Sequence, residues 1–146
     1  MFYQRHDCDK LTGPEEEGMA KLQLLPDVYA VCRLDRDAPV PDWATHGPLT
    51  SITRTSSELS VVCQQAGVPS GIKMEDGWRA LMVEGPLGFS LTGVLASLTD
   101  PLAREGISVF ALSTYDTDYL LVKKEQLEKA VQVLRVDGYD VEKACR

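Results

Sequence analysis

The chain has 146 residues, of which 44% are hydrophobic, and a net charge of -7 with an isoelectric point near 4.8. This length and apolar content suffice for one compact unit or two very small ones. The chain has no dense run of lysine and arginine, so nucleic acids and anionic membranes are excluded as partners. No apolar run approaches the roughly 20 residues that span a bilayer.

The N-terminal residues and the cysteines indicate the cellular compartment of the protein. Residues 1–19 have the composition of a flexible tail, because they are polar and include a charged, turn-forming stretch with nothing to bury. They show no secretory signal. The four cysteines match no zinc or redox spacing, and Cys32 and Cys63 lie in apolar strand-like runs. Reduced, buried thiols of this kind predict a cytoplasmic protein.

In the first half of the chain, apolar runs alternate with segments rich in proline or glycine. Ordered structure is expected to begin near Leu22, and three prolines make residues 37–48 a loop with one helical turn. A polar hairpin turn joins the last two strands. The expected elements are a short run closed by a turn (24–27), strands at 28–34, 49–53 and 59–64, a helical turn at 42–44, and a linker at 66–77.

The second half has a clearer alternation of strands and helices. Apolar residues at helical spacing follow Ser90, a candidate N-cap, and Gly106 is expected to close this helix. Pro101 is expected to kink the helix or end it early, because proline lacks the backbone donor. A second amphipathic helix begins near Leu127. The expected strands are at 78–84, 107–112, 119–123 and 139–141.

This second half has the order β-α-β-β-α-β, which is typical of a ferredoxin-like module with both helices on one face of an antiparallel sheet. Part of the pattern occurs earlier in the chain. Residues 53–62 align with 113–122 at an offset of 60, and residues 29–35 align with 79–85 at an offset of 50. Two matches in the same order indicate duplication. The sequence therefore predicts an α+β fold of two ferredoxin-like modules, with a degenerate first module at 22–70 and a complete second module at 71–145.

Two segments of the second half resemble the ACT domains of the CASTOR-like family, small bacterial tandem-ACT proteins related to the arginine sensors of animal nutrient signalling. They are Trp78–Gly93 and Ile107–Val122, and the run from Ser113 to Asp118 is the most distinctive part. The resemblance is weaker in the first half, through Tyr29–Leu34 and Ser51–Thr55. It implies a non-catalytic tandem ACT fold that binds an amino acid or similar small metabolite between modules.

Two loops form the candidate ligand-binding site. Backbone N–H groups at the start of the expected first helix suit a ligand carboxylate, and the neighbouring glycines permit close approach. The polar turn near residue 115 offers acceptors for an ammonium group, and the resemblance implies that Asp118 matches the acidic residue that holds a cationic ligand end. The candidate residues are Gly85, Pro86, Gly88, Phe89, Ser90, Leu91, Thr92, Ser113, Thr114, Tyr115, Asp116, Thr117 and Asp118.

Each part of this site also has a plainer interpretation. The turn at 85–88 is explained equally well as a connection from strand to helix. Asp116 and Asp118 could instead bind turn amides, but the resemblance favours ligand binding for them. The matching turn at Ser56–Glu58 is expected to be an ordinary hairpin turn, although pseudo-twofold symmetry would make it a second, degenerate pocket. Arg54 is expected to be a solvated surface side chain rather than a carboxylate ligand.

Catalysis and metal binding have little support in the sequence. His6 lies in the tail and His46 in the proline-rich loop, and neither belongs to a triad pattern or a phosphate-binding motif. Two carboxylates in Asp-Thr-Asp fall short of a calcium loop. The sequence therefore predicts a regulatory sensor with no cofactor, not an enzyme, whose partners are a small metabolite and either a second copy of the chain or a regulated protein. The alternative function is a protein–protein interaction module without a small ligand.

Overall fold

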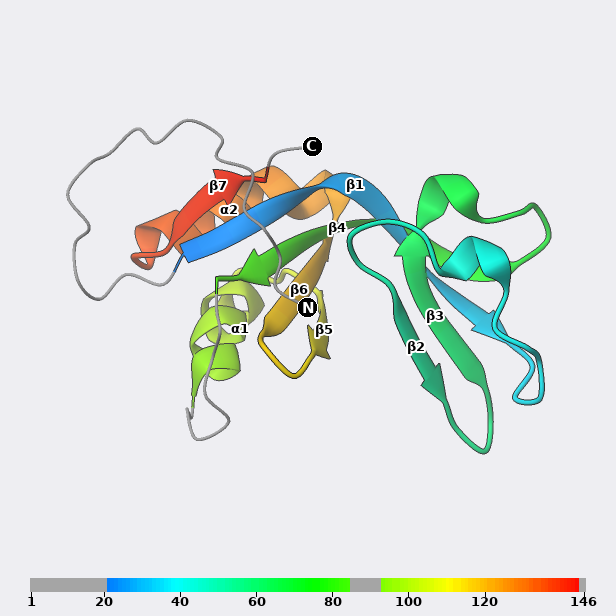
Figure 1. Ribbon diagram of the computed structural model, residues 1–146. Helices are drawn as coiled ribbons and strands as arrows, with labels where there is room; N and C mark the ends of the chain where they lie inside the picture. Colours follow the sequence, from blue (N-terminus) through cyan, green and yellow to red (C-terminus); the bar gives the residue numbers. More distant parts are fainter. Residues whose placement is uncertain (1–20, 85–92, 145–146) are drawn as a thin grey trace.

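The computed structural model describes residues 21–84 and 93–144. Within them, one curled seven-stranded sheet carries two α-helices, as Figure 1 shows. This is the predicted α+β class, whereas the tail expected at residues 1–19 lies outside the described residues. The elements are β1 (Lys21–Leu34), β2 (Ser51–Arg54), β3 (Leu59–Gln64), β4 (Lys73–Val83), α1 (Val94–Arg104), β5 (Val109–Ser113), β6 (Asp118–Lys123), α2 (Leu127–Val136) and β7 (Asp140–Lys143).

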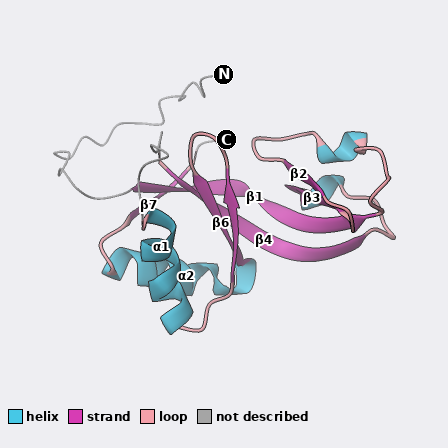
Figure 2. Ribbon diagram, turned by 90° about the horizontal axis from the view of Figure 1, so that it is seen from below, coloured by secondary structure: helices cyan, strands magenta, loops and turns pink. Residues whose placement is uncertain are grey.

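The sheet is organised around two long antiparallel neighbours, β1 and β4. The strand order is β2-β3-β1-β4-β6-β5, so one hairpin flanks each side of this central pair (Figure 2). The strand β3 pairs with the second half of β1, and β6 pairs with the second half of β4. The two halves of the chain thus share one continuous sheet. The division into domains at 22–70 and 71–145 stays a prediction.

The two hairpins match in register at an offset of 59 rather than the expected 60. Arg54 pairs with Leu59 in the first hairpin, and Ser113 pairs with Asp118 in the second. The sequence alignment of the two hairpins was shifted by one residue, because both turns are rich in hydroxyl groups. Composition alone does not determine which residues of the two strands are paired. Backbone hydrogen bonds fix that pairing in the folded chain.

The last strand is separated from the first strand of the second half. β7 pairs in parallel with β1, which lies between β7 and β4. β1 can fill this position because it is longer than predicted. It continues through Pro26 and Asp27, where a turn was expected, and a register shift between Leu24 and Val28 accommodates these residues.

The helices α1 and α2 cover one face of the sheet in the C-terminal half. Their apolar sides pack against β-strand residues in the largest core cluster, whose fully buried members include Leu81, Leu98, Leu120 and Leu134. On the same strands, the opposite face carries a second cluster. It contains Tyr29, Trp78, Phe110 and Leu121, together with other apolar residues, and no described helix covers it.

The first half has no α-helix among the described residues, and a loop covers its core instead. The predicted helical turn at 42–44 is confirmed as a short 3-10 helix, and Ala44 from this turn packs with β1 and β3. Cys32 and Cys63 are buried free thiols in this cluster, as predicted. Contact with the Cys63 thiol, together with burial, raises the pKa of Cys32.

Three expected boundaries in the second half were wrong. β4 begins at Lys73, so the expected linker at 66–77 ends earlier than predicted. α1 begins at Val94 with Gly93, at a φ of 77°, as its N-cap instead of Ser90, and Ser90 lies outside the described residues. Pro101 does not end the helix early, since the chain remains helical to Arg104, and its ring is buried in the core. No helix in the described part of the chain is long and apolar enough to cross a membrane.

Candidate functional site

The turn between β5 and β6 is closed by its own threonines. The Thr114 backbone N–H donates to the Thr117 carbonyl at 2.8 Å. The Thr114 hydroxyl donates to the same carbonyl at 3.1 Å and accepts the Thr117 N–H at 3.3 Å. These bonds fix a tight turn with Tyr115 and Asp116 at its tip. The Thr114 hydroxyl, expected to bind a ligand, is therefore used in holding the turn together.

A buried hydrogen bond anchors this turn to the end of β4. Thr117 is only 8% exposed, and its hydroxyl donates to the Val83 carbonyl at 2.6 Å. The next residue, Glu84, donates its backbone N–H to the Lys21 carbonyl at 2.8 Å. The turn, the end of β4 and the beginning of β1 therefore meet at one end of the sheet. Sequence reasoning listed Thr117 as a ligand contact and had no signal for this structural role.

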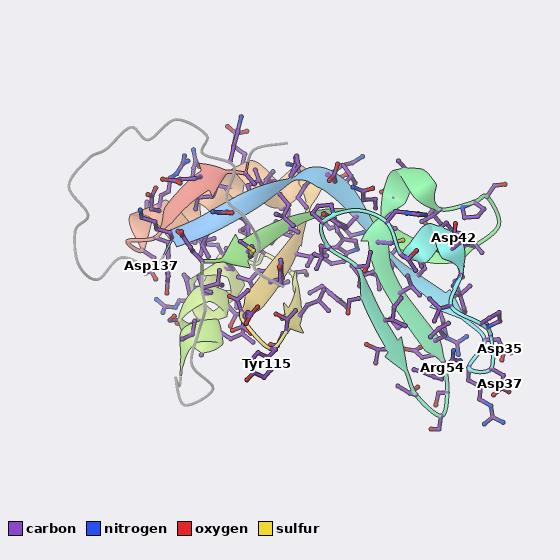
Figure 3. The ribbon with its side chains drawn as sticks, in the orientation of Figure 1. Asp35, Asp37, Asp42, Arg54, Tyr115 and Asp137 are labelled. Atoms are coloured by element: carbon purple, nitrogen blue, oxygen red, sulfur yellow. The ribbon has the colours of Figure 1, made fainter. Side chains whose placement is uncertain are left out.

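The exposed groups of the turn are mainly acidic. The Ser113 hydroxyl donates to Asp118 Oδ1 at 2.6 Å, which orients a half-buried carboxylate. Asp116 is exposed, and Tyr115 is 82% exposed at the tip of the turn (Figure 3). The structure thus brings the side chains of Ser113 and Asp118 into contact, while Asp116 lies at the exposed tip of the same turn. In the part of the chain that the structure describes, no group of three histidine, cysteine or acidic side chains is placed to hold a metal ion.

The other predicted half of the site cannot be placed against this turn. It lies outside the described residues and comprises Gly85, Pro86, Gly88, Phe89, Ser90, Leu91 and Thr92. Glu84, the residue that directly precedes it, is described and lies one position beyond the carbonyl that Thr117 binds. The chain therefore enters the 85–92 segment from the end of the sheet where the β5–β6 turn is anchored.

The matching turn between β2 and β3 has the same backbone closure but different surroundings. The Thr55 N–H donates to the Glu58 carbonyl at 2.9 Å, and the Thr55 hydroxyl accepts the N–H groups of Ser57 and Glu58. Arg33 and Arg36 donate to the carbonyls of this turn, and Arg33 Nε lies 3.3 Å from the Glu58 carboxylate. The carbonyls and the glutamate of this turn are thus bound within the chain, in agreement with the expectation of an ordinary hairpin turn.

Arg54 has a role that the sequence did not indicate. Its guanidinium donates to the carbonyls of Arg36 and Ala38, and the second bond measures 2.7 Å. Arg54 is exposed, as expected of a surface arginine, but it also links β2 to the loop that follows β1 (Figure 3). A single exposed arginine carries no sequence signal for such a contact, since its carbonyl partners lie 16 and 18 residues away.

Trp78 is a further residue that sequence reasoning did not single out. It lies on β4 in the second core cluster, with its ring centroid 6.0 Å from that of Phe110. Lys123 Nζ lies 4.7 Å from the indole centroid, a cation–π arrangement. The buried indole N–H has no hydrogen-bond partner among the described atoms. The Trp78 side chain therefore makes contacts with both β5 and β6.

Comparison with known sequences separates the two halves of the chain. Residues 73–136 match the family model described as the ACT domain, and residues 27–71 match a second model described only as an N-terminal domain. The Bos taurus protein named cytosolic arginine sensor for mTORC1 subunit 1 is 38% identical over 64 residues. The match covers 42% of this chain and 20% of that protein, so the chain spans about a fifth of the curated relative's length.

Solved structures match over more of the chain. The X-ray structure of protein Atu0741 from Agobacterium tumefaciens has a TM-score of 0.82 and 36% identity, and the match covers 88% of this chain and 96% of that chain. The ligand-free regulatory subunit of aspartate kinase from Thermus thermophilus has a TM-score of 0.52 and 10% identity, with coverage of 76% and 93%. At 10% identity, this second likeness concerns the fold alone.

Proposed function

We propose, from the ACT domain that residues 73–136 carry, that this chain is a regulatory protein that reversibly binds an amino acid or a similar small metabolite. The curated relative named as an arginine sensor supports a role in sensing, although the match covers a fifth of that protein. We further propose that the chain is cytoplasmic and non-catalytic and contains a pair of ACT-type modules of the CASTOR-like kind. The ligand would lie between modules.

The hydrogen bond from Thr117 to Val83 is the observation that carries the proposed site. It holds the acidic turn beside the end of β4, where the chain enters residues 85–92. The ammonium group and the carboxylate of an amino acid are attached to the same carbon atom. A site that binds both therefore needs hydrogen-bond acceptors and hydrogen-bond donors close to each other. The carboxylates of Asp116 and Asp118 suit the ammonium group, because charge-assisted hydrogen bonds are the stronger kind. The proposed donors for the ligand carboxylate are backbone N–H groups of 85–92.

Regulation would follow from a ligand that prefers one packing of the modules. A ligand shifts a conformational equilibrium only by its difference in affinity for the two states. The long strands β1 and β4 connect the two halves of the sheet, so a change at the β5–β6 turn has a continuous backbone path to the first hairpin.

A thermal-shift panel of the free amino acids tests the proposal. A ligand present at about 100 times its Kd adds about 2.7 kcal/mol to the free energy of unfolding. For a domain of this size, the melting temperature then rises by several degrees. We expect at least one amino acid to produce this rise in the wild-type chain. We expect Asp118→Asn to abolish it, because an amide loses the charge but can still accept the Ser113 hydroxyl.

Glu58→Gln is the matched control, since Glu58 is the acidic residue of the other hairpin turn. It should retain the full ligand response. An Asp118→Asn variant that folds and still responds would place the ligand elsewhere. If no amino acid stabilises the wild-type chain, amino-acid sensing is wrong for this protein.

The second candidate function is an interaction module without a small ligand. The outer edge of β5 favours it, because no strand among the described residues pairs with that edge. A wild-type chain that shows no thermal response but binds a macromolecule through this edge would favour this function over sensing.

A further inference from the structure

Cys32 and Cys63 are close neighbours on two paired strands of the first half. In the ladder between β1 and β3, Cys32 lies opposite Val61 and Cys63 lies opposite Ala30. The two cysteines are therefore diagonal neighbours, and both project from the same face of the sheet, because side chains alternate along a strand. Both residues are buried free cysteines in one core cluster, and their thiols are in contact.

The two thiols also differ in their readiness to react. The hydrogen bond between them raises the pKa of Cys32 and lowers the pKa of Cys63, while burial raises both. Cys63 is the better nucleophile of the pair, since the thiolate is the reactive form of a cysteine. Cys32 lies where it can react with whatever forms at Cys63. A nucleophilic cysteine next to a resolving cysteine is the arrangement of redox-sensitive thiol pairs.

Among the described residues, a loop covers these thiols. Ala44, from the short 3-10 helix, is buried in the cysteine cluster, and Ala38 and Trp43 of the same loop pack against it. Arg54 holds this loop through the carbonyls of Arg36 and Ala38. A segment held by few contacts opens locally while the rest of the domain stays folded. Such an opening gives a small oxidant access to both thiols.

From this arrangement we propose that Cys32 and Cys63 form a reversible disulfide, with hydrogen peroxide as the oxidant. The Cys63 thiolate attacks one peroxide oxygen, the O–O bond breaks, and a sulfenic acid and hydroxide form. Cys32 Sγ then attacks the sulfenic sulfur, so that the S–S bond forms and the S–O bond breaks. The leaving hydroxide takes the Cys32 proton, and the first hydroxide takes the proton that Cys63 lost. Two thiols thus lose two electrons and two protons, and one peroxide becomes two waters.

The new bond would join β1 to β3 and would be regulatory in character. In a reducing compartment, such as the one proposed for this chain, a disulfide is transient and signals an oxidant. A thiol reductant reverses it by exchange. β1 pairs with β3 in the first half and with β7 in the second, so the cross-link acts on a strand that both halves share. The inference is independent of the proposed ligand, because the cysteines lie outside the β5–β6 turn.

Mass spectrometry of the full chain treated with hydrogen peroxide tests this inference. The chain has four cysteines, so Cys8→Ser combined with Cys145→Ser leaves only Cys32 and Cys63. This double variant should lose the mass of two hydrogen atoms and regain it with a thiol reductant. Peptide mapping of the oxidised wild-type chain without reductant should show the same link. Adding Cys32→Ala to the double variant should prevent the loss and leave a sulfenic acid at Cys63 that dimedone labels.

The rate of oxidation tests whether the loop controls access to the thiols. Arg54→Ala should raise this rate about fivefold, because the loop opens more easily without its two hydrogen bonds. Arg104→Ala is the matched control, since Arg104 is an exposed arginine on α1 that binds Asp100. It should leave the rate unchanged, and circular dichroism confirms that each variant is folded.

Several outcomes would overturn the inference. The proposed pair is wrong if Cys32 and Cys63 stay reduced in peroxide, if the map links other cysteines instead, or if dimedone does not label Cys63 when Cys32 is absent. An unchanged rate in Arg54→Ala, or equal acceleration in Arg104→Ala, would contradict access through the loop.

Discussion

The two hairpin turns of this protein have the same closure and different surroundings. Each is a four-residue turn that begins with a threonine. The threonine backbone N–H donates to the carbonyl of the fourth residue, and the threonine hydroxyl accepts the backbone N–H of that residue. In the first hairpin, arginines from β1 and the following loop bind the turn's carbonyls and its glutamate. In the second, a buried threonine anchors the turn to β4, and its aspartates face solvent or lie at the surface.

This difference teaches that turn geometry does not by itself make a binding site. Both turns present hydroxyl and carboxylate groups, but among the described residues arginine side chains bind only the first turn. The first turn has a structural role, because its carbonyls and its glutamate bind arginine side chains of the same chain. The second keeps the carboxylates of Asp116 and Asp118 at the surface, as the proposed binding of an ammonium group requires.

The largest expected contrast concerns the cores beneath the two hairpins. Leu120→Ala should lower the free energy of unfolding by about 4 kcal/mol, because two helices restrict collapse around the cavity. Leu59→Ala, at an equally buried leucine under a loop, should lower it by about 2 kcal/mol, since a loop can move inward. Urea denaturation measures both. Equal or reversed losses would contradict the view that the helix-covered core is the more rigid.

A smaller contrast tests the anchors of the two turns. Thr117→Val keeps the side-chain shape but leaves the Val83 carbonyl without its donor, and we expect a loss of about 1–3 kcal/mol. Glu58→Ala, at the corresponding position of the first turn, removes an exposed ion pair with Arg33 and should change stability by less than about 1 kcal/mol. Thermal and chemical unfolding report both values. A neutral Thr117→Val substitution would show that the anchor is dispensable.

The smallest contrast compares the residues that begin the two turns. Arg54→Ala should lower stability by about 1 kcal/mol, because two hydrogen bonds to the loop after β1 are lost. Ser113→Ala, its counterpart in the second hairpin, should lower stability by about 0.5 kcal/mol through loss of one exposed bond to Asp118. Amide hydrogen exchange should increase at residues 35–38 in the Arg54 variant only. Unchanged exchange there would mean that Arg54 does not hold the loop.

Much of the local structure could be predicted from the sequence. Strand alternation, helical spacing and turn composition placed most elements within a few residues, because these signals come from neighbours along the chain. The hydroxyl-rich run from Ser113 to Asp118 was likewise found as a polar turn. The burial of Thr117 was not, because its partner Val83 is 34 residues away and nothing in the turn's composition indicates that contact.

The sequence by itself therefore determined the α+β class, the two hairpins and the acidic character of the second turn. Tertiary structure decided the offset of 59 between the hairpins, the insertion of β1 between β7 and β4, and the contacts of Arg54. The physical reason is that periodicity is a property of neighbouring residues. Register, strand order and hydrogen-bond partners are set instead by backbone groups that meet only when distant segments fold together.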